Sequence, residues 1–179
     1  ASTYRMETLR DFFAQYRFSV VRGNVSELLA VGGAASNTKG VDAGAADAVT
    51  EENLQERVEF FKQLSAKLGA VVSVSGAIDI IASPERAYIC RNGHPMMSCV
   101  TGTGCMLSAL TAAYCGGNPD NILEAAAAAT TAMGVAGDIA YQKTKEQGLG
   151  TGSFRVYLMD AISLVDAETL QGGMNVEIR

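Results

Sequence analysis

Residues 100–110 read VTGTGCMLSAL, and this stretch decides the fold because a glycine-rich turn runs directly into an apolar helix. Gly102 and Gly104 precede the point near Cys105 where helical periodicity begins. The first turn of a helix exposes amide hydrogens and a partial positive charge, and glycine lets a ligand approach the backbone closely. The stretch therefore predicts either an anion site of the phosphate-binding kind or an ordinary loop before a helix, and composition alone favours neither.

The glycine stretch matches no standard nucleotide motif. No GK[ST] follows the glycines, so it is not a P-loop, and the spacing is not GxGxxG. Cys105 at the helix start would need a partner base to act as a covalent nucleophile. The single histidine, His94, lies in the sequence RNGHP, and we interpret it as a turn residue. A covalent Cys–His mechanism is thus possible in principle but unsupported.

Composition limits the classes of function. The chain has 179 residues, 48% of them hydrophobic and 18% charged, which predicts one domain with a sizeable core. A net charge of −5 without a run of Lys or Arg argues against a nucleic-acid partner. The four cysteines form no CxxC pair, which favours reduced thiols in a cytoplasmic protein over a zinc site. The apolar stretch 125–137 is too short to predict a membrane span.

Periodicity predicts an α/β domain. Amphipathic spacing predicts a helix over 5–17, a short buried strand follows at 18–21, and RGNVSE, residues 22–27, leads into a helix that ends at Gly32–Gly33. A surface loop over 32–50 precedes a helix that Thr50 caps. Residues 70–83 predict strand, turn and strand, and 86–93 a third strand with a hairpin turn at Asn92–Gly93. Helices are predicted over about 104–115, 120–146 and 153–165.

RGNVSE and GTGSF, residues 150–154, are two further candidate stretches. Arg22 can bind phosphate oxygens, and Glu27 can hold Mg²⁺ directly or through water. Alternatively, Asn24 and Glu27 simply cap the helix. Ligands of open α/β sheets gather at the carboxyl ends of strands, which favours the functional interpretation. For GTGSF the simpler interpretation, a turn with Ser153 as N-cap, is preferred.

Five motifs occur in one order along the chain: RGNVSE, KGVD (residues 39–42), VSGAID (74–79), VTGTGC (100–105) and GTGSF. With them the chain resembles the hydroxyethylthiazole kinase family of the ribokinase-like superfamily over nearly its whole length. The resemblance implies a single domain over 1–179 with a three-layer αβα fold and a mostly parallel central sheet. It also implies phosphorylation of 4-methyl-5-(2-hydroxyethyl)thiazole by ATP and Mg²⁺ in thiamine biosynthesis or salvage, by a cytoplasmic homotrimer with sites between subunits.

The resemblance also implies roles for individual residues. Arg22 and Asn24 would contact ATP phosphates, and Glu27 would organise Mg²⁺. Gly102 would lie near the thiazole alcohol, and Cys105 would take the place of the catalytic Asp of sugar kinases. We expect this thiol to orient or modestly activate the substrate hydroxyl, because phosphoryl transfer depends mainly on positioning and charge neutralisation. The remaining implied contacts are nucleotide binding by Ser75, Thr101 and Thr103, and an anion hole shaped by Gly102 and Gly104.

Two departures from the family pattern keep alternatives open. Ala77 stands where the family has Glu, so a Mg²⁺ or phosphate role of that Glu is lost or moved. The sequence from Ala1 matches the family after its first strands, so we expect those strands, part of the thiazole pocket and an acidic metal residue to be absent here. The alternatives are another small-alcohol kinase of the superfamily, such as a hydroxymethylpyrimidine kinase, and a non-catalytic nucleotide-binding fragment.

Overall fold

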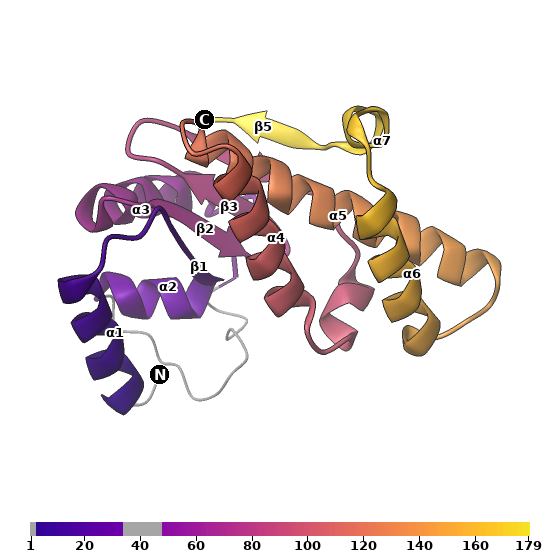
Figure 1. Cartoon of the computed structure of the whole chain (residues 1–179), viewed down its shortest axis with the longest axis horizontal. Helices are drawn as coiled ribbons and strands as arrows, with labels where there is room; N and C mark the ends of the chain where they lie inside the picture. Colours follow the sequence, from indigo (N-terminus) through magenta and orange to yellow (C-terminus); the bar gives the residue numbers. More distant parts are fainter. Residues whose placement is uncertain (1–2, 34–47) are drawn as a thin grey trace. The chain divides into compact units, whose positions relative to one another are not determined.

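The computed structural model describes residues 3–33 and 48–179, and the KGVD motif lies outside these residues. The described chain divides into two compact units. The first comprises the residues up to Ile89 together with Ile178–Arg179, and the second comprises Cys90–Glu177. The α/β class predicted from the sequence is confirmed, as a mixed sheet flanked by helices (Figure 1).

The first unit contains three helices and the beginning of the sheet. Its helices are α1 (Thr3–Gln15), α2 (Val25–Gly32) and α3 (Leu54–Leu68). Its strands are β1 (Val20–Asn24), β2 (Val71–Ser75) and β3 (Asp79–Ala82), with most of β4 (Ala87–Cys90). The sheet has the order β1-β2-β3-β4-β5, where β5 is Val176–Ile178.

The sheet combines parallel and antiparallel pairing. Strands β1 and β2 are parallel, with Val20 opposite Val71 and Asn24 opposite Ser75, so both strands end at the same edge. Strands β2 and β3 are antiparallel, as the predicted strand–turn–strand requires. Ala87 and Arg179 exchange backbone hydrogen bonds of 2.6 and 2.8 Å, which ties the residue after β5 to β4.

Alternation along the strands builds the core of the first unit. Val72 and Val74 lie two residues apart on β2 and therefore share one face of the sheet. Both are fully buried in one apolar cluster with Leu28 of α2 and Phe61 of α3. Removing each such side chain from water contributes roughly 1.5–3 kcal/mol, so this cluster fixes α2 and α3 against β2 and β3.

The second unit is mainly helical. It contains the 3₁₀ helix η2 (Pro95–Cys99), α4 (Thr103–Gly117), α5 (Ile122–Glu146), α6 (Thr151–Leu164) and α7 (Ala167–Gly173). Helix α5 packs against α4 and α6 (Figure 1). Phe154 and Leu158 of α6 are fully buried in a cluster with Met133 and Ala136 of α5. The alanine-rich stretch 125–137 thus contributes to a close-packed core.

Small residues let other segments approach α5 closely. A Cβ added at Gly134 would lie 2.6 Å from the Cβ of Asn92, and one added at Gly137 would overlap the Met97 sulfur. Among the residues described, α5 alone has the length and apolar composition that would allow a helix to cross a membrane. However, 72% of its apolar window is buried inside the protein, as in the core helix of a globular domain.

Some boundaries differ from the prediction for local reasons. The first strand begins at Val20 and continues to Asn24 because it pairs with all of β2, which leaves Phe18 outside it. Thr50 is not the cap of α3. The helix begins at Leu54, and Asn53 occupies the N-cap position while its side-chain oxygen accepts a hydrogen bond from the Thr50 amide.

Three further predictions were wrong or incomplete. Asn92–Gly93 does not form a hairpin, because the chain continues into η2 and the Asn92 amide group bonds to Asp138 and Gly173. Ser153 is not an N-cap, since α6 begins at Thr151 with Gly150 before it. The periodicity analysis did not identify α7 and β5. The amphipathic helix α1 forms as predicted but has no buried residue.

Candidate functional site

The carboxyl ends of β1 and β2 bring together three predicted nucleotide contacts. Asn24 ends β1 opposite Ser75, which ends β2. Arg22 lies two residues before Asn24, and its Nη2 donates a hydrogen bond of 2.8 Å to the Ser75 hydroxyl. Parallel pairing therefore places a guanidinium, an amide and a hydroxyl at one edge of the sheet, where open α/β sheets bind ligands.

Asn24 and Glu27 form a complete capping box at the start of α2. The Asn24 side-chain oxygen accepts from the Glu27 amide at 2.8 Å, and Glu27 Oε2 accepts from the Asn24 amide at 2.8 Å. Two amide groups of the helix start are thus satisfied reciprocally. The capping interpretation of this pair is confirmed, and the carboxylate of Glu27 is also solvent-exposed. The metal role of Glu27 stays a prediction.

Asp79 belongs to the same edge and was not identified as a site residue from the sequence. It begins β3, and its Oδ1 accepts a hydrogen bond of 2.8 Å from the Gly76 amide across the β2–β3 turn. Burial raises the pKa of Asp79 from 3.8 to about 7, while the Gly76 amide and the charge of Arg22 act in the opposite direction. An ionisable group poised near neutral pH beside Arg22 is a common property of functional sites.

Apart from Glu27 and Asp79, the strand-end group offers few side chains that could bind a metal ion. Ala77, which replaces the family Glu, is exposed in the β2–β3 turn. Within the described residues no group of three or more His, Cys, Asp or Glu side chains could hold a metal ion. A cation here would therefore depend on few carboxylates, as Mg²⁺ does when it is bound largely through water and substrate phosphates.

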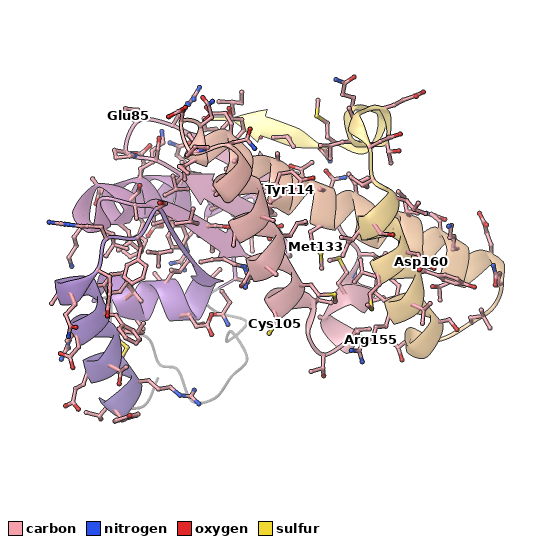
Figure 2. The ribbon with its side chains drawn as sticks, viewed as in Figure 1. Glu85, Cys105, Tyr114, Met133, Arg155 and Asp160 are labelled. Carbon is pink, nitrogen blue, oxygen red and sulfur yellow. The ribbon has the colours of Figure 1, made fainter. Side chains whose placement is uncertain are left out.

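The second candidate group lies at the start of α4, in the other unit. Gly102 is the N-cap with φ +102°, a left-handed conformation that favours glycine, and as a glycine it has no side chain to cap the helix. Cys105 is exposed and free of any disulfide, and Figure 2 shows it at this end of α4. Thr101 is exposed, whereas Thr103 and Gly104 are partly buried. A glycine-rich helix start is the position at which the sequence predicts either an anion site or an ordinary loop before a helix, and the structure adds an exposed thiol in its first turn.

Hydrogen bonds between Thr103 and the η2 segment hold the turn at the start of α4. The Thr103 hydroxyl donates to the carbonyl oxygens of Met97 and Val100, at 3.3 and 3.5 Å. His94 is the N-cap of η2, and its Nδ1 accepts a hydrogen bond from the Met96 amide at 3.2 Å. The interpretation of His94 as a turn residue is thus confirmed.

Among the described residues, the GTGSF stretch adds no functional side chain to the strand-end group or to the start of α4. Gly150 precedes α6, and Phe154 is fully buried in the core of the second unit. This agrees with the simpler interpretation of the stretch as a helix start, although the capping residue is Gly150.

Comparisons with known proteins agree with the motifs. The model of the hydroxyethylthiazole kinase family matches residues 1–168. The hydroxyethylthiazole kinase of Clostridium acetobutylicum is 42% identical over 177 residues, which are 99% of this chain and 64% of that protein. Hydroxyethylthiazole kinase 2 of Clostridium botulinum (strain Langeland) is 42% identical over 161 residues, 90% of this chain and 58% of that protein.

A solved structure shares the fold. The hydroxyethylthiazole kinase protein from Pyrococcus horikoshii OT3 superimposes with a TM-score of 0.79 at 24% sequence identity, over 99% of this chain and 61% of that one. This chain thus spans less than two thirds of the length of these relatives. Since the family model covers nearly every residue and the motifs occur in the order expected, the chain belongs to the hydroxyethylthiazole kinase family.

Proposed function

We propose that the protein transfers the γ-phosphate of ATP to the hydroxyl of 4-methyl-5-(2-hydroxyethyl)thiazole, a step of thiamine biosynthesis or salvage. The observation that carries the proposal is the glycine-rich start of α4 at Gly102–Cys105, with an exposed thiol in its first turn. Family membership and the Arg22–Ser75 pair at the strand ends support it. Membership of this family also supports the proposal that the enzyme is cytoplasmic.

The strand-end group would bind the nucleotide. Arg22 presents a guanidinium, whose fork of N–H donors suits phosphate oxygens. Its present acceptor, the Ser75 hydroxyl, is neutral, so an anionic phosphate would be a stronger acceptor for the same donor. Ser75 and Asn24 would then hydrogen-bond to the nucleotide beside it.

The start of α4 would receive the charge that moves during transfer. The first turn of a helix carries a partial positive charge, which would stabilise negative charge on the transferred phosphoryl group. Gly102 and Gly104 keep Cβ atoms away from the substrate alcohol. Cys105 would orient the attacking hydroxyl, because in-line transfer depends on positioning more than on a strong base. Thr101 and Thr103 would complete the nucleotide contacts.

The residues fit Mg²⁺ as a partner of the nucleotide. Glu27 presents an exposed carboxylate, and this ion needs only one or two protein carboxylates when phosphates and water supply its other ligands. Bound there, Mg²⁺ would neutralise phosphate charge. Glu27 would hold it directly or through water, while Asn24 keeps the carboxylate in place through the capping box.

We also propose that the protein assembles as a homotrimer with sites between subunits. The support is the family resemblance, together with exposed apolar side chains near the N-terminus: Tyr4 and Phe12 of α1 expose 77% and 48% of their accessible surface, and Tyr16, just after the helix, exposes 57%. Sedimentation velocity tests the assembly. A mass three times that of the chain is expected, and a monomer at micromolar concentration would contradict it.

The activity test is direct. The protein is incubated with MgATP and the thiazole alcohol, and thiazole phosphate is measured by mass spectrometry, with a panel of other alcohols that includes hydroxymethylpyrimidine. Preference for the thiazole alcohol is expected. Phosphorylation of another alcohol instead would assign a different kinase, and nucleotide binding without any transfer would favour a non-catalytic role.

Two variants test the assigned residues. Arg22→Ala should raise the Kd for ATP about tenfold or more, because it removes a charge-assisted phosphate contact worth about 1.5–3 kcal/mol. Cys105→Ala should lower kcat roughly tenfold to a hundredfold with little effect on nucleotide affinity. Cys99→Ala is the matched control, since Cys99 is also an exposed thiol but lies in η2. Equal loss in the two cysteine variants would contradict a role for Cys105.

A further inference from the structure

His94 lies outside the residues assigned to the reaction, yet it connects η2, which precedes α4 in the chain, with α5. Its ring stacks on Tyr141 of α5, with centroids 3.3 Å apart and planes 11° from parallel. Its Nδ1 accepts the Met96 amide hydrogen bond at 3.2 Å, and its carbonyl oxygen accepts from the Met97 amide at 2.9 Å. One residue therefore fixes η2 at its first turn while its ring rests on α5.

Helix α5 holds the same segment at two other points. The Asp138 carboxylate accepts hydrogen bonds from the Gly93 amide at 3.2 Å. The Met97 side chain lies against Gly137, where an added Cβ would overlap its sulfur atom. Gly137 and Asp138 lie about one turn before Tyr141 on α5, so each is a neighbour of Tyr141 on the helix surface, and all three contact residues 93–97.

From this segment the contacts continue to the start of α4. The Met97 carbonyl oxygen accepts from the Val100 amide at 3.4 Å and from the Thr103 hydroxyl at 3.3 Å. Thr103 is the first residue of α4, between Gly102 and Gly104. A displacement of η2 would therefore move the turn that presents the first amide groups of α4.

We propose that His94 is a positioning residue that sets the first turn of α4 for phosphate binding, acting through η2 and Thr103. This inference deepens the kinase assignment and depends on it for its functional consequence. His94 takes no part in proton transfer. Its Nδ1 serves as the acceptor of the Met96 amide hydrogen, so the ring has a structural partner on this side.

Three substitutions separate the two interactions of the ring. His94→Asn keeps a side-chain acceptor suited to an N-cap but loses the stack. His94→Phe keeps the stack and loses the acceptor, and His94→Ala loses both. Tyr141→Leu removes the stack from the side of α5 without touching η2, and it serves if a His94 variant does not fold.

Two measurements are made on each folded variant. Hydrogen exchange of the amides of residues 103–105 reports the order of the turn without any ligand or activity. Isothermal calorimetry with MgATP reports its consequence. In His94→Ala we expect at least tenfold faster exchange at these amides and at least tenfold weaker nucleotide binding. His94→Asn and Tyr141→Leu, which remove only the stack, and His94→Phe, which removes only the acceptor, should each show a smaller change in the same direction.

The outcomes distinguish this inference from the kinase assignment. Unchanged exchange at 103–105 in His94→Ala or Tyr141→Leu overturns the positioning role, whatever the affinity. Equal loss in the Asn and Ala variants also overturns it, because the acceptor would then be irrelevant. If the wild-type protein binds no MgATP, the proposed kinase function fails, and the exchange measurement alone decides the role of His94.

Discussion

Asp79 accepts a hydrogen bond in the β2–β3 turn, which follows Ser75, and it also interacts electrostatically with Arg22. Its carboxyl group is partly buried at the start of β3 and receives the Gly76 amide, one residue after Ser75. The Arg22 guanidinium is bound to Ser75 at 2.8 Å. The protonation state of Asp79 therefore affects the electrostatic environment of the proposed phosphate-binding side chain, even though Asp79 makes no phosphate contact in the proposal.

The pKa of Asp79, raised by burial from 3.8 to about 7, predicts how stability depends on pH. The folded state binds the proton of Asp79 more tightly than the unfolded state does. The protonated carboxyl group therefore contributes fully to the free energy of unfolding below pH 3.8, and this contribution is lost as the pH rises through about 7. Relative to Asp79→Asn, the wild type should lose on the order of 1–3 kcal/mol of unfolding free energy between pH 5 and 8. Urea unfolding at several pH values measures the difference.

Asp166→Asn provides the control for that experiment. Hydrogen bonds from Thr169 lower the pKa of Asp166 below 3.8, so its contribution is present above that pH and is lost only in acid. The difference between the wild type and this variant should stay constant between pH 5 and 8. An equally flat difference for Asp79→Asn would show that Asp79 is ionised throughout this range.

Helix α5 depends on the small size of its glycines. In Gly134→Ala the new Cβ would meet the Cβ of Asn92 at 2.6 Å and its carbonyl carbon at 2.9 Å, atoms that cannot rotate away. Overpacking of this kind costs about 1–3 kcal/mol and outweighs the gain of about 0.5–1 kcal/mol from replacing a helical glycine. We expect a net loss of unfolding free energy, measured by urea titration.

Gly116→Ala is the matched substitution for α4. Its added Cβ has no neighbour within 4 Å, so only the helix preference should act, and stability should rise slightly or stay unchanged. A loss as large as that of Gly134→Ala would show that helix glycines matter here through backbone freedom and not through packing.

Elements that depend on local chemistry could be predicted from the sequence. The spacing of Asn24 and Glu27 predicted the capping box, and the Gly32–Gly33 pair predicted the end of α2, where Gly33 adopts the left-handed conformation. The Asn92–Gly93 pair was misleading because the side chain of Asn92 is used elsewhere. It bonds to Asp138, to the Gly173 carbonyl and to the Asn175 amide, distant groups that no local pattern reveals.

The molecule as a whole has four reduced cysteines in two environments. Cys99 and Cys105 are exposed, whereas Cys90 and Cys115 are buried. Burial also raises the pKa of Cys115, which leaves less of the reactive thiolate. A disulfide-exchange reagent should label two thiols quickly in the native protein and four in guanidinium chloride. MgATP should slow one of the two fast reactions, and Cys105→Ala should remove that protected thiol.

Only part of the candidate site could be predicted from the sequence. Arg22 and the Gly102–Cys105 turn were predicted because strand ends and helix starts have recognisable local patterns, whereas Ser75 was predicted only from the family resemblance. Asp79 and His94 were not assigned functional roles, since their importance depends on burial and on partners distant in sequence, such as Arg22 for Asp79 and Tyr141 for His94. Packing that joins distant segments was thus the part that composition and spacing did not reveal.

The reciprocal cap of α2 has a consequence for any cation that Glu27 receives. Its carboxylate oxygen already accepts the Asn24 amide, so a metal that drew this oxygen away would fray the helix it begins. Occupancy and helical order would then be thermodynamically linked, and each would weaken the other to the same degree. A cation carried in by the nucleotide and released with the product suits such a carboxylate better than a permanently resident one.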